Sequence, residues 1–303
     1  MKAFSYTKSP YLVAEIDKIE ELRKTLLLTT LSPNEEILFQ WNTQIDRIYF
    51  TFLLNNKQIA RSEIKSLIKT NSLEVSRFKK TLDYLYQQWL VSSETVNVKA
   101  FTTLYLLLYG KRANPPEEDL QNSLKYIQTN PDNPLVASAL SQILLLTTDY
   151  FGPESNLMAP LAGLLFLYKY GYDFRRMLVL EEYYYQHKDR YQGLINRSLR
   201  DTNITPWLEF VVEAASYQLN KLLRQISSKD YAQNDSRLVV GLNDRQNSLL
   251  RLLDEPGSKI SNKIVQKKFK VSPITAARDL AKLVNLGVLF AIGKGRSTYY
   301  TKV

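Results

Sequence analysis

The spacing of apolar residues along residues 11–225 is the strongest constraint on the fold, because they recur every three and four positions. This spacing places apolar side chains on one face of an α-helix, and it is clearest between Leu22 and Tyr49. Turn-forming clusters at 110–118 (GKRANPPEE) and 130–134 (NPDNP) interrupt the pattern. We therefore expect a mainly α fold, with further helices over 62–69, 76–90 (with Ser76 as its N-cap), 120–128, 135–147, 157–170, 178–199 and 206–226.

The positive charge of the chain is concentrated at its C-terminal end. Residues 242–303 contain twelve Lys and Arg against four Asp and Glu, so they hold a net charge of +8 out of the total of +10. Such an asymmetry favours a polyanionic partner for this segment. A solvated basic face has the same composition, and charge alone does not choose between the two.

The last sixty residues have the layout of a winged helix. We expect helices over 245–253 and 261–269, the second with Ile264, Val265 and Phe269 facing inward. A third helix begins after Ser272 as N-cap, with Pro273 in its first turn, and Gly287 ends it in a left-handed conformation. Two strands follow, 288–292 and 297–302, joined by the turn Gly293-Lys294-Gly295-Arg296. A small β-hairpin therefore completes the predicted domain.

The third helix has two faces in this interpretation. The inward stripe consists of apolar residues: Ile274, Ala277, Leu280, Ala281 and Val284. The outward face carries polar and charged residues spaced i, i+3, i+4 and i+7: Thr275, Arg278, Asp279 and Lys282. An outward face of this kind fits the major groove of DNA, where polar and cationic side chains contact base edges and phosphates.

The expected DNA-binding residues follow from this arrangement. Major-groove contacts are assigned to Ser272, Thr275, Arg278 and Lys282. Lys294 and Arg296 at the hairpin tip would contact the flanking backbone or minor groove. Lys267 and Lys268, together with Lys263 and Lys270, would add phosphate contacts that weaken as salt rises. A homodimer is expected because one winged helix reads little sequence, and a winged helix used for protein contact stays open as the alternative.

The sequence offers little for catalysis or metal binding. There is no cysteine, no P-loop, no G-x-G-x-x-G, no G-x-S-x-G and no pair of histidines, so we expect no metal site. The single histidine, His187, is expected on a helix surface. The N-terminal residues do not resemble a signal peptide, and the longest apolar runs are too short to span a bilayer. We expect a cytoplasmic protein with no membrane partner.

The helical body resembles the Fic (Fido) family. The resemblance is carried by residues 134–182 without a gap, by PPEE at 115–118, and by LEEYY (180–184) and TPWLEF (205–210). In the C-terminal segment, TAARDLAKLVNLG and GKGRSTYY resemble the winged-helix tail of many Fic proteins. The resemblance implies a helical Fic fold and, in active members, transfer of AMP from ATP to a protein hydroxyl through the motif HPFx(D/E)GNGRxxR.

The residues at the motif position depart from that pattern. They are Asp149, Tyr150, Phe151, Gly152, Pro153, Glu154, Ser155, Asn156 and Leu157, followed by Pro160 in place of the second arginine. Asp149 is a weaker base at neutral pH than the histidine it replaces, although Glu154 could still bind a divalent ion. The loss of two glycines and two arginines removes the expected phosphate contacts. Only Phe151 matches the motif in place.

A second motif is also altered. TFLLNN at 51–56 resembles the family's inhibitory pattern (S/T)xxxE(G/N), keeping Thr51 and Asn56 but placing Asn55 where the glutamate belongs. On the residues alone, the same stretch is equally well described as the end of a helix and a turn.

These observations predict a domain order and a function. The order is an N-terminal helical region of the Fic-like body (1–95), a Fic-like core (96–226), a linker (227–241) and a winged-helix domain (242–303). We expect a non-enzymatic, DNA-binding regulator of transcription or signalling without a cofactor, whose helical body mediates dimerisation, protein binding or binding of a small ligand. Two alternatives stay open: a protein adenylyltransferase with altered residues, using ATP and magnesium, and a protein-binding adaptor.

Overall fold

The computed structural model describes residues 4–65, 72–129, 133–228, 242–255, 257–293 and 295–302. The chain divides into two compact units, Met1–Thr29 with Thr43–Ser227, and Thr30–Asn42 with Ser228–Val303. We refer to them as the body and the C-terminal unit. In the described part of the chain, no helix has the length and apolar character needed to cross a membrane.

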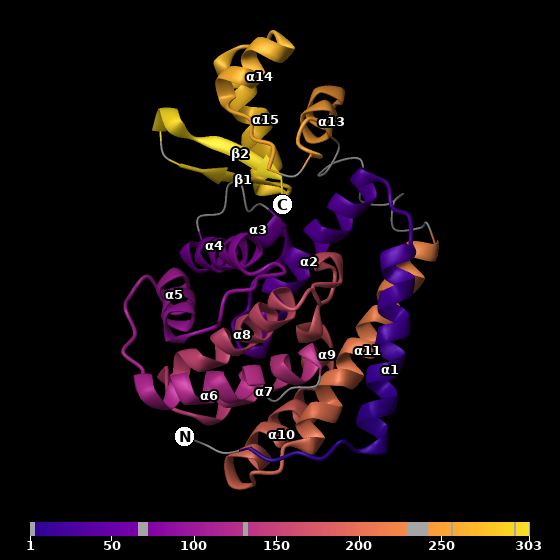
Figure 1. Cartoon of the computed structure of the whole chain (residues 1–303), viewed down its shortest axis with the longest axis vertical. Helices are drawn as coiled ribbons and strands as arrows, with labels where there is room; N and C mark the ends of the chain where they lie inside the picture. Colours follow the sequence, from indigo (N-terminus) through magenta and orange to yellow (C-terminus); the bar gives the residue numbers. More distant parts are fainter. Residues whose placement is uncertain are drawn as a thin grey trace. The chain divides into compact units, whose positions relative to one another are not determined.

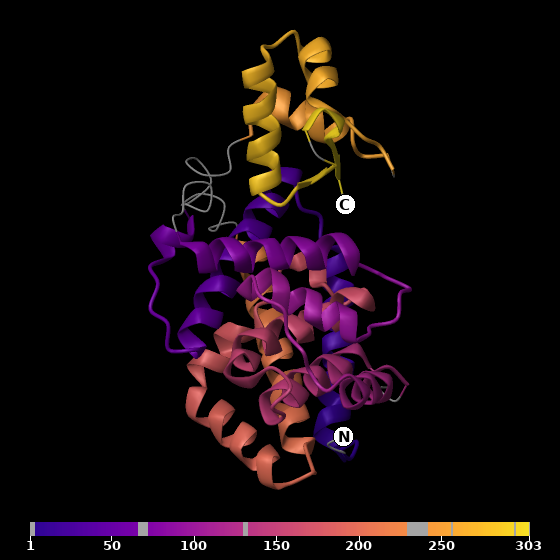
Figure 2. The same cartoon turned by 90° about the vertical axis from the view of Figure 1, so that its left-hand side faces the viewer.

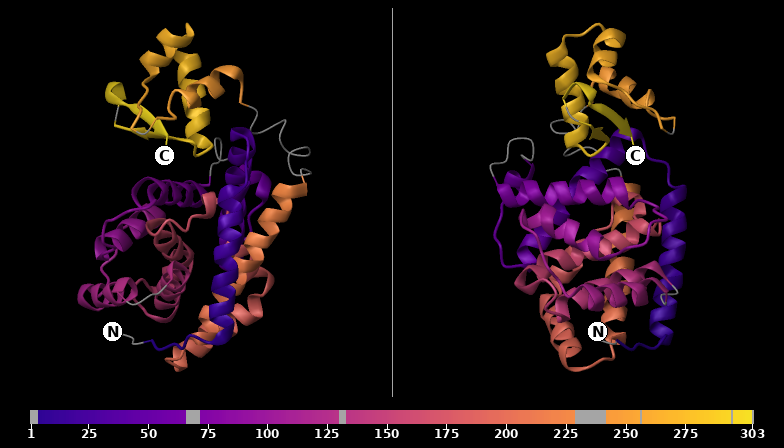
Figure 3. Two further views of the ribbon diagram at one scale, coloured as in Figure 1. Left: turned by 45° about the vertical axis from the view of Figure 1, so that its right-hand side comes forward. Right: turned by 60° about the vertical axis from the view of Figure 1, so that its left-hand side comes forward.

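The body is built from helices, which confirms the predicted mainly α fold (Figure 1). Its elements are α1 (Pro10–Leu28), α2 (Pro33–Leu54, which begins in the C-terminal unit), α3 (Arg61–Lys65), α4 (Leu73–Gln88), α5 (Val98–Tyr109), α6 (Glu117–Thr129), α7 (Pro134–Thr147), η1 (Gly152–Glu154), α8 (Ser155–Lys169), η2 (Phe174–Arg176), α9 (Leu180–Gln186), α10 (Lys188–Arg200) and α11 (Thr205–Ser228). The helices α1 and α11 run side by side (Figure 3).

Several predicted helix limits are wrong. The cap of α4 is Ser72, whose hydroxyl accepts a hydrogen bond from the Val75 amide at 3.4 Å, rather than Ser76. The single helix expected over 178–199 is broken at the exposed His187, where α9 ends and α10 begins. The predicted helix 62–69 is described only to Lys65, and part of the NPDNP turn (130–132) lies outside the described residues. The first two residues of the predicted linker belong to α11, and 229–241 also lie outside them.

Helices α7 and α8 form the centre of the body (Figure 2). Residues 135–145 and 157–168 are all buried, as expected for helices that are covered on every side. Gly163 allows the two helices to approach closely, because a Cβ there would lie 2.5 Å from Gln142 Nε2 and 2.9 Å from Ser138 Oγ. The indole of Trp207 in α11 donates to the Ala139 carbonyl at 2.9 Å, so α11 is also joined to α7.

Replacing Gly163 with leucine is expected to lower the free energy of unfolding by about 1–3 kcal/mol, because the added side chain overpacks the contact between α7 and α8. The matched control is Gly193→Leu in α10, where a Cβ meets no atom within 4 Å. That replacement is expected to stabilise the protein by about 0.5–1 kcal/mol through helix propensity. Chemical denaturation of both variants measures the difference, and equal stabilities would contradict the close approach at Gly163.

In the described residues after 241, the helices α13, α14 and α15 precede a two-stranded antiparallel sheet of the C-terminal unit (Figures 1 and 2). Besides residues 30–42, its elements are α13 (Asp244–Arg251), α14 (Asn262–Phe269), α15 (Pro273–Asn285), β1 (Leu289–Ile292), η3 (Gly295–Ser297) and β2 (Tyr299–Lys302). The strands pair from Leu289 with Lys302 to Ile292 with Tyr299. Ile260 adds an antiparallel bridge to Tyr300 through two backbone hydrogen bonds of 2.9 and 2.7 Å. The predicted small β-hairpin is confirmed.

Local capping at α15 also follows the prediction. The Ser272 hydroxyl accepts from the Thr275 amide at 3.1 Å, Pro273 occupies the first turn, and Gly287 adopts a φ of +71°. The core of the unit is formed by side chains with no exposed surface: Leu249, Val265, Ala276, Leu280, Leu283 and Leu289.

Candidate functional site

The segment that resembles the Fic motif joins α7 to α8. Gly152 adopts a φ of +61°, and the short η1 turn leads directly into Ser155, the first residue of α8. Phe151 is buried and stacks on Tyr105, with 5.5 Å between the ring centroids. Leu157 is buried as well, whereas Asn156 is exposed. Hydrophobic packing therefore holds both ends of the segment.

Glu154 is engaged by a cation from outside the motif. Its carboxylate lies 2.7 Å from Lys111 Nζ, and its carbonyl accepts from the Tyr109 hydroxyl at 2.9 Å. The hydrogen bond from Lys111 lowers the pKa of Glu154. No group of three or more His, Asp or Glu residues suitable for a metal ion occurs among the described residues. Glu154 is thus the acceptor of an ion pair that joins the motif segment to the loop after α5.

The chemistry available in this segment is limited. Between Asp149 and Pro160 the chain has two carboxylates but no histidine, lysine or arginine. A site for the polyphosphate of ATP needs cations or converging backbone amides, since a carboxylate repels the phosphate oxygens. Residues 149–160 therefore supply no cationic side chain for a phosphate, and their two charged groups are both carboxylates.

The segment that resembles the inhibitory motif ends α2. Thr51 is fully buried, and the side-chain amide of Asn55 donates to the Thr51 carbonyl at 2.8 Å. Asn56 takes a left-handed φ of +56°, and its side-chain oxygen accepts from Lys188 Nζ at 2.8 Å. Asparagine is one of the few residues other than glycine that adopt this conformation readily after a helix. Asn55 and Asn56 therefore act as a helix end and turn.

The exposed face of α14 is basic. Lys263, Lys267 and Lys268 are exposed, and none of them forms an ion pair with another described residue. Val265 is the buried residue of this helix, as predicted, but Phe269 is only partly buried. Ile264 is 49% exposed, so its predicted inward position is wrong. The helix thus presents three lysines and an isoleucine to solvent.

The outward face of α15 is rotated by about a quarter of a turn from the predicted one. Ile274, Ala277 and Ala281, expected in the core, are exposed, and Ile274 is 66% exposed. The buried stripe consists instead of Ala276, Asp279, Leu280 and Leu283. Of the predicted DNA-binding residues, Ser272 and Arg278 are exposed, while Thr275 and Lys282 lie half-buried at the edges of the outward face.

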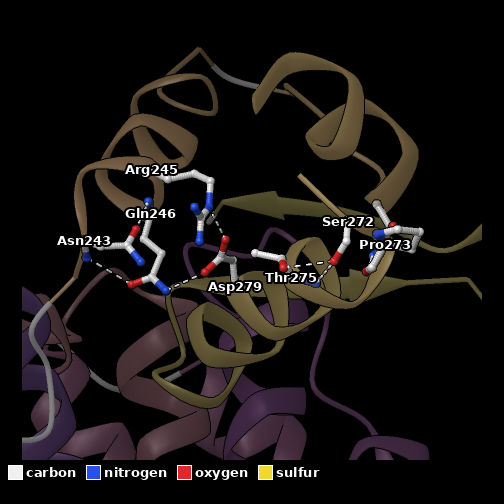
Figure 4. Close-up of polar contacts among 8 residues, drawn as sticks. Asn243, Arg245, Gln246, Ser272, Pro273, Thr275 and Asp279 are labelled. Carbon is white, nitrogen blue, oxygen red and sulfur yellow. Dashed lines mark hydrogen bonds and ion pairs between the residues drawn. The ribbon is translucent and has the colours of Figure 1, made fainter. Parts of the chain in front are cut away.

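The buried stripe of α15 includes the carboxylate of Asp279, which is held by two side chains of α13 (Figure 4). Its Oδ2 accepts from Arg245 Nε at 2.5 Å, and its Oδ1 accepts from Gln246 Nε2 at 2.7 Å. Gln246 also closes a capping box with Asn243 at the start of α13. Burial raises the pKa of Asp279, but the hydrogen bonds from Arg245 and Gln246 outweigh it and hold the pKa below its usual value.

Arg245 and Gln246 were missed from the sequence. The signal that could have found them is the regular spacing of Ala276, Asp279, Leu280 and Leu283, in which an acidic residue shares a stripe with apolar ones. A charged residue in such a stripe requires a partner on a neighbouring element.

The tip of the hairpin is only partly described. Gly293 has a φ of +90°, and a Cβ there would lie 2.8 Å from the Ser297 carbonyl oxygen, so the turn requires glycine. Lys294 lies outside the described residues, as does the side chain of Arg296. Their assigned contacts with the DNA backbone remain expectations.

Comparison with known proteins supports the fold. No protein-family model matches the sequence, and no curated protein matches it. Among solved structures, a Fic family protein from Desulfovibrio desulfuricans G20 superposes with a TM-score of 0.61 at 15% sequence identity, covering 98% of this chain and 97% of that chain. The fold expected from the sequence resemblance is thereby confirmed: the chain has the fold of a Fic family protein.

Proposed function

We propose that the chain is a non-enzymatic Fic-like protein that binds DNA through a winged helix formed by residues 242–303, and that it regulates transcription or signalling. The exposed cations of α14 and α15 carry this proposal. Lys267, Lys268 and Arg278 point to solvent without an ion pair in the described part of the chain. The acids Asp254 and Asp279 are each paired, with Lys302 and Arg245 respectively. The surplus positive charge is therefore available to a polyanion.

In the proposed complex, α15 enters the major groove with its outward face towards the bases. Ser272 and Thr275 lie at the N-terminal end of the helix, where side chains of a recognition helix contact base edges. Their hydroxyls are 3.0 Å apart, so one can donate to the other while its partner accepts or donates to DNA. Lys263, Lys267 and Lys268 contact phosphates, and Lys294 and Arg296 at the hairpin tip contact the flank.

Replacing Lys267 and Lys268 together with glutamine is expected to flatten the dependence of log affinity on log salt by about 1.8, because each lost phosphate contact contributes about 0.9 to the slope. Affinity for a duplex should fall on the order of tenfold near physiological salt. The matched control is Lys99→Gln with Lys125→Gln, which removes the same charge from exposed positions of the body. Equal losses of affinity in both double variants would show that only the net charge matters. That result would contradict a specific DNA-binding surface on α14.

The body is proposed to be inactive as a nucleotidyl transferase. The motif segment has no histidine or arginine, and its Glu154 is paired with Lys111. Incubation with labelled ATP and magnesium or manganese, with and without lysate proteins, is expected to leave the chain and the lysate unlabelled. Label that disappears in Asp149→Ala would instead establish a transferase with altered residues and would contradict this part of the proposal.

The body would then serve assembly, binding of a protein partner or binding of a small ligand. A homodimer is proposed because two winged helices read two half-sites, which multiplies specificity. Sedimentation of the full chain with and without duplex distinguishes a dimer from a monomer. An adaptor that only binds protein would show neither ATP labelling nor DNA binding.

A further inference from the structure

The outward face of α15 is apolar where a solvent-exposed helix is ordinarily polar. Ile274 is 66% exposed, and Ala277 and Ala281 are exposed at positions i+3 and i+7 from it. Arg278 lies on the same face, between the two alanines. A single exposed isoleucine would need no explanation, but these residues form one row beside an arginine that is free of ion pairs among the described residues.

We propose that this row reads the C5-methyl groups of thymines in the major groove, with Arg278 reading a base edge between them. Thymine is the only base that presents a methyl group in the major groove, and apolar side chains are the ones that recognise it. Arginine pairs there with the O6 and N7 acceptors of guanine. The inference rests on the proposed function, since it specifies which DNA the C-terminal unit prefers.

Charge complementarity favours duplex DNA as the occupant of this face. The exposed lysines of α14, the helix before α15, suit a phosphate backbone, and Arg278 adds a cation to the row itself. The start of α14 is tied to the start of α15, because the Asn262 side chain donates to the Pro273 carbonyl at 3.2 Å. The lysine-bearing helix therefore begins beside the first turn of the helix that carries the apolar row.

The length of the row limits what it can read. Ile274 and Ala281 are seven residues apart, which corresponds to about 10 Å along the helix axis. At about 3.4 Å per base pair, this is a span of about three base pairs. We therefore expect a short recognition core with a thymine at one or both ends and a guanine contacted by Arg278 within it.

The buried Asp279 keeps this face in place. Its bonds to Arg245 and Gln246 hold the only acidic side chain of α15 against α13, on the side opposite the apolar row. A rotation of the helix by one residue would turn this carboxylate towards the DNA, where it would repel phosphates. Arg245, Gln246 and Asp279 are thus positioning residues for the reading face.

The test compares thymine with deoxyuridine, which pairs identically but lacks the methyl group. Duplexes are first enriched from a random pool by the full chain, and each thymine of an enriched duplex is then replaced singly. We expect affinity to fall about three- to fivefold at one or two thymines, the value of one buried methyl group. The salt dependence should stay unchanged at those positions, because no phosphate contact is lost.

Two matched variants test whether α15 or α14 distinguishes thymine from deoxyuridine. Ile274→Ser should bind the thymine and deoxyuridine duplexes equally at one of these positions. Ile264→Ser, which changes an isoleucine of similar exposure on α14, should keep the discrimination. Loss of discrimination in Ile264→Ser alone would overturn the assignment to α15.

The remaining outcomes separate this inference from the proposed function. Salt-dependent duplex binding with no effect of deoxyuridine at any position would overturn the inference and leave DNA binding intact. Failure to bind any duplex at low salt would overturn both. If Ile274→Ser alters sedimentation of the free chain but not DNA binding, the row is a protein contact and the inference is wrong.

Discussion

Replacing Glu181 with alanine is expected to lower the free energy of unfolding by about 3–5 kcal/mol, the cost of leaving a buried charge without its partner. Arg47 in α2 and Glu181 in α9 have side chains only 2% and 3% exposed, and Arg47 Nε lies 3.5 Å from Glu181 Oε1. The guanidinium also donates to the Leu178 carbonyl. Burial raises the pKa of Glu181 while Arg47 opposes the rise, so the carboxylate depends on this arginine to stay charged.

The surroundings of the pair cannot replace a lost carboxylate. A cavity of about 10 Å³ beside it, lined by Gln142, Leu164 and Tyr184 among others, has room for a single water. Without Glu181, no carboxylate among the residues that line this cavity would balance the buried charge of Arg47.

A double replacement distinguishes the ion pair from packing. Arg47→Met with Glu181→Leu removes both charges and keeps the volume, so most of the lost stability should return. Glu21→Ala, which breaks an exposed ion pair with Lys24, is the control and should cost less than about 1 kcal/mol. Denaturant unfolding of wild type, Glu181→Ala, the double variant and Glu21→Ala measures these differences in stability. A cost for Glu181→Ala no greater than that of Glu21→Ala would contradict a charged pair in the core.

Replacing Asp279 with alanine is expected to destabilise the C-terminal unit by about 2–4 kcal/mol, since it leaves Gln246 buried without a partner and Arg245 without its carboxylate. This loss of stability is smaller than that for Glu181 because the Arg245 side chain is 29% exposed and can be hydrated. Asp254→Ala, which breaks an exposed pair with Lys302, is the control and should cost less than about 1 kcal/mol.

The contribution of Asp279 should depend on pH. Because the folded pKa lies below the unfolded value of about 3.9, the stabilisation is fully present above that value and is lost as pH falls through the folded pKa. The difference in stability between wild type and Asp279→Ala should therefore be constant from neutral pH to about pH 5 and shrink below about pH 4. A difference that does not change with pH in the acid range would show that Asp279 is not the charged acceptor of Arg245 and Gln246.

Features with a local cause could be predicted from the sequence. The hairpin, the Ser272 cap, Pro273 in the first turn and the left-handed Gly287 each depend on a few neighbouring residues. The helical periodicity predicted most helices of the body for the same reason, because it depends only on residues within one or two turns. The cap of α4 was misplaced because Ser72 and Ser76 are both acceptable locally, and only the structure shows which one starts the helix.

Features that depend on residues far apart in the sequence could not be predicted. Asp279 is buried against Arg245, which lies 34 positions earlier in the sequence. The assumption that an acidic residue faces solvent therefore predicted the wrong outward face for α15. The partner of Glu154 is Lys111, 43 positions earlier, and no spacing within the motif indicates it. The break at His187 also lacks a proline or glycine that would have marked it.

Titration of a labelled mixed-sequence duplex with the full chain, at several salt concentrations, tests DNA binding. We expect binding at low salt and a log–log slope of about −2.7 or steeper, from at least three phosphate contacts by Lys263, Lys267 and Lys268. No binding at low salt, or an affinity that does not change with salt, would contradict the claim that the C-terminal unit binds DNA.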